Sequence, residues 1–473
     1  MSTTRHPALW TFVITSLGLF MVTLDNLVVT MALPVIRTDL GASLESLEWT
    51  VNAYTLTFAV LLLTGATLGD RFGRKRMFAI GMGIFTIASA AAALAPSIEA
   101  LVVARGLQGV GGAIVMPLTL TLLSAAVRPE KRGLALGAWG GIGGLAVALG
   151  PLVGGAVVEG VSWQWIFWLN VPIGLVILPL ALRRLNESHG PHSKLDLAGL
   201  ALASAGLFGI VWGVVRGNGQ GWTSLEVLGS LGLGTALVVA FVLWERRTKT
   251  PMLPMRFFRN RAFAATNAAS LFMFFGMFGA IFLLAQFLQT VQGYSPLEAG
   301  LRTLPWTAMP MFIAPVAGAL SDRIGGRPLM ATGLALQAGA LAWLAAITEP
   351  DVPYSRLIAP FIIAGVGMSL FFAPVANVVL SSVRRQEEGQ ASGANNAIRE
   401  LGGVFGVAVL AAIFAGYGGY GTPESFVDGL VPAVWVGAAV VGLGALAALA
   451  VPGVRRRRKE PARAKAGLAL ERA

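Results

Sequence analysis

The segment GATLGDRFGRKRM at residues 65–77 returns as GALSDRIGGRPLM at residues 318–330. Each copy follows one apolar run and precedes another, so each is expected to form a short polar loop between two helices. Within these segments Asp70-Arg71 matches Asp322-Arg323, and two more matches follow in the same order: GVGGAIVMP at 109–117 with GVGMSLFFAP at 365–374, and Gly137-Ala138 with Gly393-Ala394. Such ordered matches at nearly constant separation predict a duplicated chain with two similar halves.

Composition places these halves in a bilayer. Hydrophobic residues make up 55% of the 473 residues, charged residues make up 12%, and the mean hydropathy is +0.72. A membrane-spanning helix needs about 20 mostly apolar residues. We predict an all-α integral membrane protein with spans at 9–36, 48–69, 77–95, 99–127, 133–158, 164–182, 196–215, 225–244, 262–290, 298–320, 328–347, 357–382, 399–416 and 430–452. The first run is too long for a signal-peptide core, so we interpret it as a retained helix.

The distribution of basic residues predicts the orientation. With the N-terminus inside, most of the 35 Lys and Arg fall in the tails or in cytoplasmic loops. The exceptions are Arg37, Arg216, Arg302 and Arg356, which fall outside, and Arg105, which lies within a span. Cytoplasmic loops carry an excess of Lys and Arg. We therefore expect both termini in the cytoplasm and an even number of spans.

The repeat and the charge pattern together divide the chain. We predict a first six-helix bundle over residues 1–185 and a second over residues 262–455. Residues 186–261 form a linker with two extra spans, which we interpret as a structural insert because neither has a central ionisable residue. Residues 456–473 form a basic cytoplasmic tail.

The loop at residues 65–77 gives the first resemblance to a known family. Its G-x-x-L-x-D-R-x-G-R-K string resembles the signature loop of the major facilitator superfamily. Read alone, the charges could serve only to hold the loop on the inner side. The resemblance implies a major facilitator fold in which this loop is a conformational latch between the halves. The matching positions are Gly65, Asp70, Arg71, Gly73, Arg74, Asp322 and Arg323, although the second copy has Gly326 inserted before Arg327.

Two ionisable residues lie inside the apolar runs of the first half. Arg105 in a membrane segment costs about 2.5–3.5 kcal/mol unless it is paired or hydrated. The only carboxylate well inside a predicted span is Asp25, which makes it the leading candidate for reversible protonation. The alternative is a fixed structural ion pair, or separate polar contacts to backbone and water. Both strings resemble family motifs, and Arg105, Gln108 and Gly109 match the R-x-x-Q-G pattern implicated in proton coupling.

The fifth predicted span, GAWGGIGGLAVALGPLVGGAVV, is rich in glycine. The pairs Gly137/Gly141, Gly140/Gly144 and Gly150/Gly154 are each four residues apart, a spacing that lets a neighbouring helix approach closely. The ending, with Gly150, Pro151, Gly154 and Gly155, resembles the motif of drug/proton antiporters. The stretch WQWIFWLNVPIG and the two extra spans resemble the fourteen-helix drug/proton antiporter family. In that family the second position of the stretch is usually an arginine, whereas this chain has Gln164 there.

The resemblance implies a proton-coupled antiporter that exports lipophilic drugs by alternating access. Candidate lining residues for a lipophilic substrate are Asn26, Tyr54, Trp139, Phe274, Phe278, Gln286 and Gln289. For each phenylalanine, ordinary packing is an equally good explanation. The second half has no carboxylate within a predicted span, so we expect poor export of dications.

The sequence also bears on other function classes. A proton-driven symporter or a facilitator for a small metabolite is the alternative function. An enzyme or a receptor is disfavoured because there is no nucleotide-binding Gly-rich loop, no cysteine and no Cys/His metal cluster. The net charge of +12 lies in short loops rather than on a soluble basic domain, which disfavours nucleic acid as a partner. We expect a monomer in a bacterial inner membrane that uses the proton gradient and needs no cofactor.

Overall fold

The structure is a computed structural model that describes residues 7–128, 132–190, 195–384 and 387–453. All the regular structure in this described part is helical. Fourteen helical spans within it are long and apolar enough to cross a bilayer, which confirms the number predicted from the apolar runs. The predicted basic tail at residues 456–473 lies outside the described residues.

The helices follow one another with short connections. In chain order they are α1 (Pro7–Asp39), α2 (Leu44–Phe72), α3 (Arg74–Ala93), α4 (Ile98–Ala126), α5 (Arg132–Gly160), α6 (Trp165–Trp168), α7 (Asn170–Arg184), α8 (Leu197–Gln220), α9 (Leu225–Arg247), η2 (Met255–Arg259), α10 (Arg261–Gln286), η3 (Phe287–Val291), α11 (Pro296–Thr307), α12 (Met309–Ile324), α13 (Gly326–Ile347), α14 (Tyr354–Ser381), α15 (Glu388–Tyr417) and α16 (Pro423–Leu449). Three spans combine two elements each, namely α6 with α7, α10 with η3, and α11 with α12.

The start of the thirteenth span differs from the prediction. We expected it at residue 399, but α15 begins at Glu388. The additional turns, EGQASGANNAIRE, are too polar to register as an apolar run. They are helical because they pack inside the protein: Ala391, Gly393 and Asn395 are all buried. Burial against neighbouring helices replaces the hydrophobic signal that a lipid-facing helix would carry.

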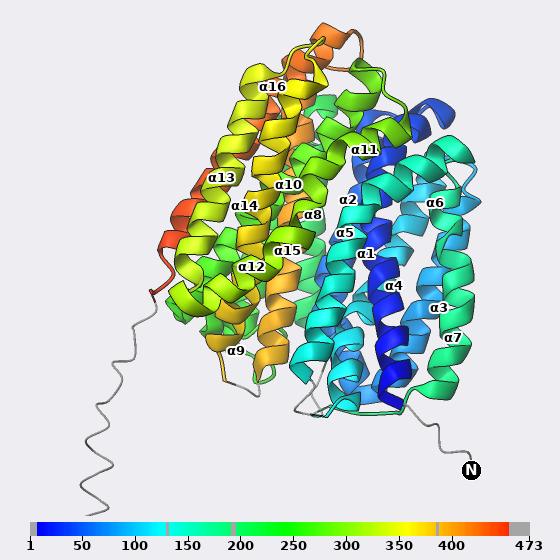
Figure 1. Cartoon of the computed structure of the whole chain (residues 1–473), viewed down its shortest axis with the longest axis vertical. Coiled ribbons are helices and arrows are strands. Elements are labelled where there is room, and N and C mark those ends of the chain that lie inside the picture. Colours follow the sequence, from blue (N-terminus) through cyan, green and yellow to red (C-terminus); the bar gives the residue numbers. More distant parts are fainter. Residues whose placement is uncertain (1–6, 129–131, 191–194, 385–386, 454–473) are drawn as a thin grey trace, which may run out of the picture.

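The spans pack as two bundles (Figure 1). In the first, α2 and α3 pack on α4, and α1 packs on α5; in the second, α10 packs on α15 and α16, and α13 packs on α14 and α16. We call α1–α7 the first bundle and α10–α16 the second bundle. Helix α1 begins and α16 ends at the same end of the molecule (Figure 1), here called the terminal end, and the opposite end is called the distal end.

The two extra spans bridge the bundles rather than standing apart. Helix α8 packs on α9 and also on α2 and α15, one helix from each bundle. The rings of Trp49, Phe208 and Trp212 lie 5.6–5.7 Å apart between α2 and α8. Arg216 of α8 pairs with Glu45 at 3.1 Å and with Glu226 at 2.7 Å. The insert is therefore fixed to the first bundle by aromatic packing and by charge.

Candidate functional site

Asp25 lies at the centre of the first bundle. Only 1% of its surface is exposed. Its Oδ2 accepts a hydrogen bond from Arg105 Nη1 at 2.5 Å, and its Oδ1 accepts from Asn170 Nδ2 at 2.7 Å and from Gln108 Nε2 at 3.2 Å. An ionised carboxylate can only accept hydrogen bonds, and all three partners here are donors. The structure therefore brings Asp25 and Arg105 into direct contact, in the geometry of a buried ion pair.

Arg105 is held from several sides. Its Nε donates to the carbonyl of Thr50 at 3.1 Å, and its Nη1 also donates to Gln108 Oε1 at 2.9 Å. The guanidinium lies 4.2 Å over the ring of Tyr54, whose hydroxyl donates to the carbonyl of Val22. Stacking on an aromatic face and hydrogen bonds to carbonyl oxygens both hold a guanidinium in place. Five helices, α1–α4 and α7, contribute to this network.

Asn170, Ser89 and Thr50 belong to the site but were not predicted from the sequence. Asn170 is buried at the first position of α7, and Ser89 accepts a hydrogen bond from Gln108 Nε2 at 2.8 Å. The available signal was weak: Asn170 is one of two amides in the otherwise apolar stretch WQWIFWLNVPIG. A polar side chain in such a run needs a partner, but the sequence does not identify which one.

The antiporter-like motif of α5 lies between the bundles. A Cβ on Gly154 would lie 2.7 Å from the carbonyl oxygen of Val28 on α1, and one on Gly155 would lie 2.2 Å from that of Pro296 on α11. Gly150 packs on Leu27, and the carbonyl of Pro151 faces Gly300 of the second bundle. No side chain larger than hydrogen fits at these contacts. The motif thus packs α5 against α1 on one side and against α11 on the other.

Three earlier glycines of α5 do not have this role, and the surroundings of Gly137 lie outside the described residues. A Cβ on Gly140, Gly141 or Gly144 would have no heavy atom within 4 Å. The spacing argument therefore holds only for the distal half of the helix. Two hydrogen bonds between the bundles also lie at the distal end: Leu297 N donates to Glu159 at 3.0 Å, and Gln289 donates to the carbonyl of Met31 at 3.1 Å.

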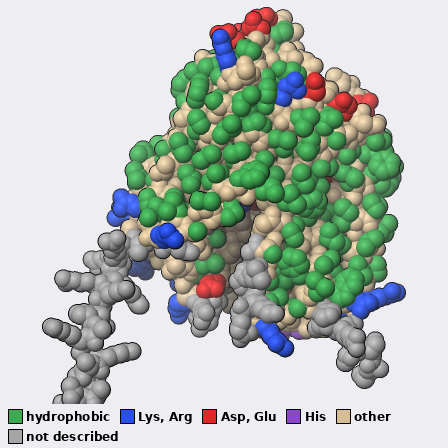
Figure 2. Space-filling model, viewed as in Figure 1, with side chains coloured by type: hydrophobic (Ala, Val, Ile, Leu, Met, Phe, Trp, Pro, Cys, Tyr) green, Lys and Arg blue, Asp and Glu red, His purple; other side chains and the backbone are tan. Residues whose placement is uncertain are grey.

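Helices α1 and α5 thus meet the second bundle at the distal end, whereas α2 packs on α15 also nearer the terminal end, where Leu63 lies against Gly393. Figure 2 shows the surface hollowed between the two bundles in the half nearer the terminal end. Most Lys and Arg side chains visible in this view also lie at the terminal end. The described conformation therefore has a hollow between the bundles that opens toward the more basic end.

The loop between α2 and α3 contacts its own bundle. Gly73 has φ of 101°, a conformation that favours glycine. Asp70 pairs with Arg74 at 2.8 Å, and its carbonyl accepts from Gly190 N at 3.1 Å. Glu187 accepts from the first backbone N–H groups of α3, a favourable place for a carboxylate. Arg71 is exposed, and Gly65 packs closely on α4. These partners all lie on the first-bundle side, so a latch between the halves stays a prediction.

The second copy of the loop has the same turn at a different glycine. Gly325 has φ of 86° and ends α12, as Gly73 ends α2, whereas Gly326 is the first residue of α13 and packs on Val378. Arg323 is exposed. The side chain of Asp322 lies outside the described residues. The extra glycine thus becomes the first residue of α13, and a single glycine still separates the two helices.

The predicted substrate-lining residues lie in different parts of the protein. Tyr54 lies beside Arg105, and the rings of Phe274 and Phe278 stack at 5.6 Å in the second bundle. Gln286 and Gln289 lie elsewhere: Gln286 binds the carbonyl of Phe282 and the hydroxyl of Tyr420, and Gln289 reaches α1 in the distal contact. Their amides are already engaged in internal hydrogen bonds.

Two predicted lining residues have unused polar atoms. Asn26 Oδ1 and Trp139 Nε1 are shielded from solvent and have no hydrogen-bond partner among the described residues. A buried polar atom without a partner costs free energy, so such atoms are available to a ligand or to water. Asn26 follows Asp25 directly, and Trp139 lies in the first half of α5, next to Gly140.

The prediction that the second half lacks a carboxylate within a span is wrong. Glu400 lies in the middle of α15, because that helix begins before the apolar run that we used to place it. Its Oε2 is shielded from solvent and unpartnered among the described residues. Glu400 lies within electrostatic range of Tyr54, across the packing of α15 on α2. The expectation of poor dication export rested on this absence and no longer stands.

Arg399 lies beside Glu400 in a partly aromatic site. Its guanidinium lies 4.4 Å from the ring centre of Phe274 and 5.2 Å from that of Phe372, and it donates to Asn396 at 3.1 Å. A cavity of about 100 Å³, lined in part by Phe372, Asn395 and Asn396, adjoins it. No group of three or more His, Asp or Glu that could hold a metal ion occurs in the described ranges.

Solved structures share this fold. A peptide transporter, POT, superposes with a TM-score of 0.70 and 18% identity over 95% of each chain. A bacterial homologue of the human lysosomal transporter Spinster, in an inward-facing and unoccupied conformation, gives a TM-score of 0.67 and 16% identity over 95% of this chain and 98% of its own. At this level of identity the likeness concerns the fold alone.

Sequence relatives are closer. The tetracenomycin C resistance and export protein of Streptomyces glaucescens is 35% identical over 427 residues, covering 90% of this chain and 79% of its own. The multidrug resistance protein Stp of Mycobacterium tuberculosis is 36% identical over 415 residues, covering 87% and 77%. The probable actinorhodin transporter of Streptomyces coelicolor is 36% identical over 418 residues, covering 86% and 72%.

The family assignment follows from the motifs, the fold and these relatives. The family model described as Major Facilitator Superfamily matches residues 15–407 and 267–472. The protein is a transporter rather than an enzyme, and it is a multi-pass protein of the bacterial cell membrane. With its fourteen spans, the chain belongs to the major facilitator superfamily.

Proposed function

We propose that this chain exports lipophilic drugs or toxic small molecules by exchange with protons. The names of its relatives, which include a multidrug resistance protein and an antibiotic export protein, support the direction and the substrate class. The observation that carries the proton coupling is Asp25: a carboxylate with 1% exposure, inside a membrane helix, held by an arginine and two amides. An ionisable group in this setting is a functional site by default.

Orientation follows from charge. We propose that the terminal end faces the cytoplasm, because short cytoplasmic loops carry the excess of Lys and Arg. The hollow between the bundles (Figure 2) then opens to the cytoplasm, where an exporter takes up its substrate. In this proposal residues 1–185 and 262–455 move against one another, and the loops at Asp70 and Asp322 form the latch that favours one state. The protein works as a monomer and needs no cofactor besides the proton gradient.

Helix α1 can link protonation to movement of the bundles. Asp25 is followed on the same helix by Leu27 and Val28, which pack on Gly150 and Gly154 of α5. The opposite side of this motif packs on α11. Protonation of Asp25 removes the charge that holds Arg105, and Arg105 retains the Thr50 carbonyl, Gln108 and the Tyr54 ring as partners. A shift of α1 therefore reaches the distal contact between the bundles directly.

The substrate site in this proposal lies between Tyr54 and the second bundle. Phe274, Phe278 and Phe372 supply aromatic surface for a lipophilic ring system. Glu400 supplies a negative charge for a cationic centre. Because its Oε2 is unpartnered among the described residues, binding a cation would satisfy a group that is otherwise buried alone.

The test is dye transport into everted membrane vesicles energised by a proton gradient. We expect vesicles with the wild type to accumulate ethidium, and a protonophore to abolish this accumulation. Vesicles with Asp25→Asn should accumulate no more ethidium than vesicles without the transporter. The matched control is Asp351→Asn, which removes an exposed loop carboxylate and should behave as wild type.

Two results would contradict the proposal. Equal proton-driven accumulation by wild type and Asp25→Asn would remove Asp25 from coupling. Proton-driven loss of dye from preloaded everted vesicles would instead identify the symporter alternative, because the direction of coupled flux would be reversed.

A further inference from the structure

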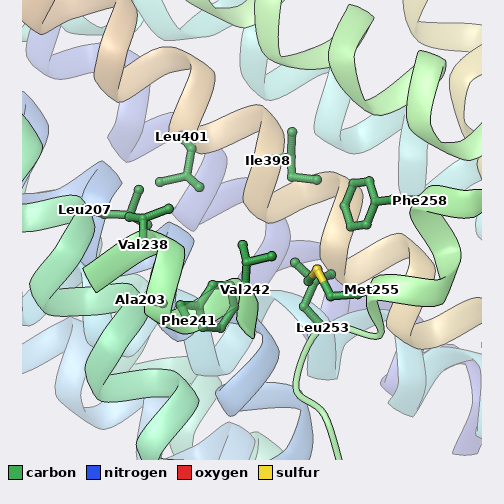
Figure 3. Close-up of a pocket in the computed structure, with 10 residues that line it drawn as sticks. All are labelled: Ala203, Leu207, Val238, Phe241, Val242, Leu253, Met255, Phe258, Ile398 and Leu401. Carbon is green, nitrogen blue, oxygen red and sulfur yellow. The ribbon is translucent and has the colours of Figure 1, made fainter. Parts of the chain in front are cut away.

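A cavity of about 340 Å³ lies between the two inserted helices and the second bundle. Figure 3 shows side chains entering it from α8, α9, the segment before α10, and α15. Leu207, Val242, Leu253 and Ile398 represent these four elements, and all ten lining residues are apolar. A site for a soluble metabolite would contain polar groups to orient it. The lining therefore suits a hydrocarbon chain.

The cavity lies just inside one membrane surface. Val242 lines it, and α9 ends at Arg247, about 7 Å further along the helix at about 1.5 Å per residue. Trp244 lies between them, is 42% exposed, and donates its indole N–H to Asp196. Tryptophan is enriched where hydrocarbon meets the headgroups. A lipid chain in the cavity would thus have its headgroup at the end of α9.

Four basic residues at the end of α9 and in the segment that follows it lack an acidic partner among the described residues. Arg246, Arg247, Lys249 and Arg259 are exposed and form no ion pair within the described part of the chain. Within the described residues the acids nearby form no ion pair with these cations: Glu245 Oε2 accepts from Leu253 N at 3.0 Å, Asp196 caps α8, and Glu387 pairs with Arg256 and Arg384. The surface beside the cavity is therefore positive and unneutralised.

From these two features we propose that the cavity binds one acyl chain of an anionic glycerophospholipid, whose phosphate lies among Arg246, Arg247 and Lys249. The apolar lining takes the chain and the unpaired cations take the charge. This inference concerns a lipid site and does not depend on proton coupling.

The site gives the two inserted helices a role. Ile398 and Leu401 line the cavity from α15, on either side of Arg399 and Glu400. A bound chain therefore packs against the helix segment that carries the second buried carboxylate. Lipid occupancy would hold this segment of α15 against α8 and α9, and would thereby link the composition of the membrane to the substrate site.

The test is native mass spectrometry of the full-length protein in detergent, titrated with phosphatidylglycerol or with phosphatidylcholine of identical chains. We expect the wild type to retain phosphatidylglycerol preferentially. The double substitution Arg246→Gln and Arg247→Gln should weaken that binding roughly thirtyfold, because each basic residue near an anionic surface contributes about a factor of five. Val242→Trp should fill the cavity and reduce retention of both lipids.

The matched control removes two arginines from the end of another span. Arg183 and Arg184 end α7, which lies on the far side of the molecule from α9 (Figure 1). Their substitution by Gln should leave lipid retention at the wild-type level. The unfolding temperature of each variant checks that it is folded, and the arginine pair still tests the proposal if Val242→Trp does not fold.

Three outcomes would overturn the proposal. Equal retention of the two lipids by the wild type would exclude a role for charge. Equal loss in the α7 control would show a general surface effect. If Val242→Trp retains phosphatidylglycerol as the wild type does but loses bound ethidium, the cavity belongs to the drug rather than to a lipid.

Discussion

The centres of the two bundles use different chemistry at equivalent places. In the first bundle Arg105 stands four residues before Gly109; in the second, Phe361 stands four residues before the matching Gly365. Phe361 is buried against Trp306, with ring centroids 5.9 Å apart. A charged pair in one bundle is thus replaced by aromatic packing in the other.

The polar groups of the second bundle are also arranged differently. Asn395 donates to Asn267 at 3.0 Å and to Ser270 at 3.1 Å, forming a neutral cluster. Arg399 and Glu400 each keep an unpartnered polar atom among the described residues, whereas every oxygen of Asp25 is satisfied. The comparison indicates a division of labour: the first bundle holds one tightly specified charge, and the second offers groups that a ligand can satisfy.

The largest effect should come from breaking the pair in the first bundle. Arg105→Ala leaves Asp25 buried without its counter-charge, and losing one partner of a buried pair costs about 3–5 kcal/mol. We expect a marked fall in the unfolding temperature of the purified protein and no export.

The double variant Asp25→Asn with Arg105→Met sharpens this prediction. It removes both charges, so most of the stability should return while export stays absent. If Arg105→Ala is as stable as the wild type, Arg105 is not needed to compensate the buried charge of Asp25.

A smaller effect is expected from replacing glycines, and it should differ between a glycine that packs within one bundle and a glycine that packs between the two bundles. A Cβ on Gly406 would lie 2.1 Å from the Phe275 carbonyl oxygen, inside the second bundle, so Gly406→Ala should lower the free energy of unfolding by about 1–3 kcal/mol. Gly155→Ala meets α11 across the interface and should chiefly weaken the distal contact. Gly141→Ala, with open space around its Cβ, is the control.

Cysteine labelling measures the opening of the distal contact. The chain has no cysteine, so a single Ala148→Cys, placed where 4% of the residue is exposed, reports the interface alone. We expect faster reaction with an aqueous maleimide in Gly155→Ala than in Gly141→Ala or Gly406→Ala. Equal rates in all three would show that the motif does not control the distal contact.

The smallest expected effect concerns Glu400. Glu400→Gln keeps the shape of the side chain and removes its charge, so stability should hardly change. Export of the monocation ethidium should fall roughly tenfold, which corresponds to about 1.4 kcal/mol of lost attraction, while export of a neutral lipophilic dye is retained.

Glu424→Gln, an exposed carboxylate at the start of α16, is the matched control for this substitution. Equal losses for the cation and the neutral dye would assign Glu400 a structural role and remove it from substrate recognition.

The sequence predicted the number of spans and the two residues of the buried pair. Fourteen apolar runs are a local property, because each residue contributes its own transfer free energy. Asp25 and Arg105 stood out for the same reason, since a charge within an apolar run is costly and rare. The start of α15 was missed because its polar turns are stabilised by burial among other helices, which no window of neighbouring residues records.

The partners of these residues were decided by the tertiary structure alone. Asp25 and Asn170 are 145 positions apart, yet their side chains lie 2.7 Å from one another. Glu400 reads as a helix end in the sequence, and only the start of α15 at Glu388 places it in the middle of a helix that packs on α2. Hydropathy determines which segments enter the membrane, because the bilayer acts on each segment separately. Which side chains meet inside depends on helix packing, because those contacts join residues that share no local pattern.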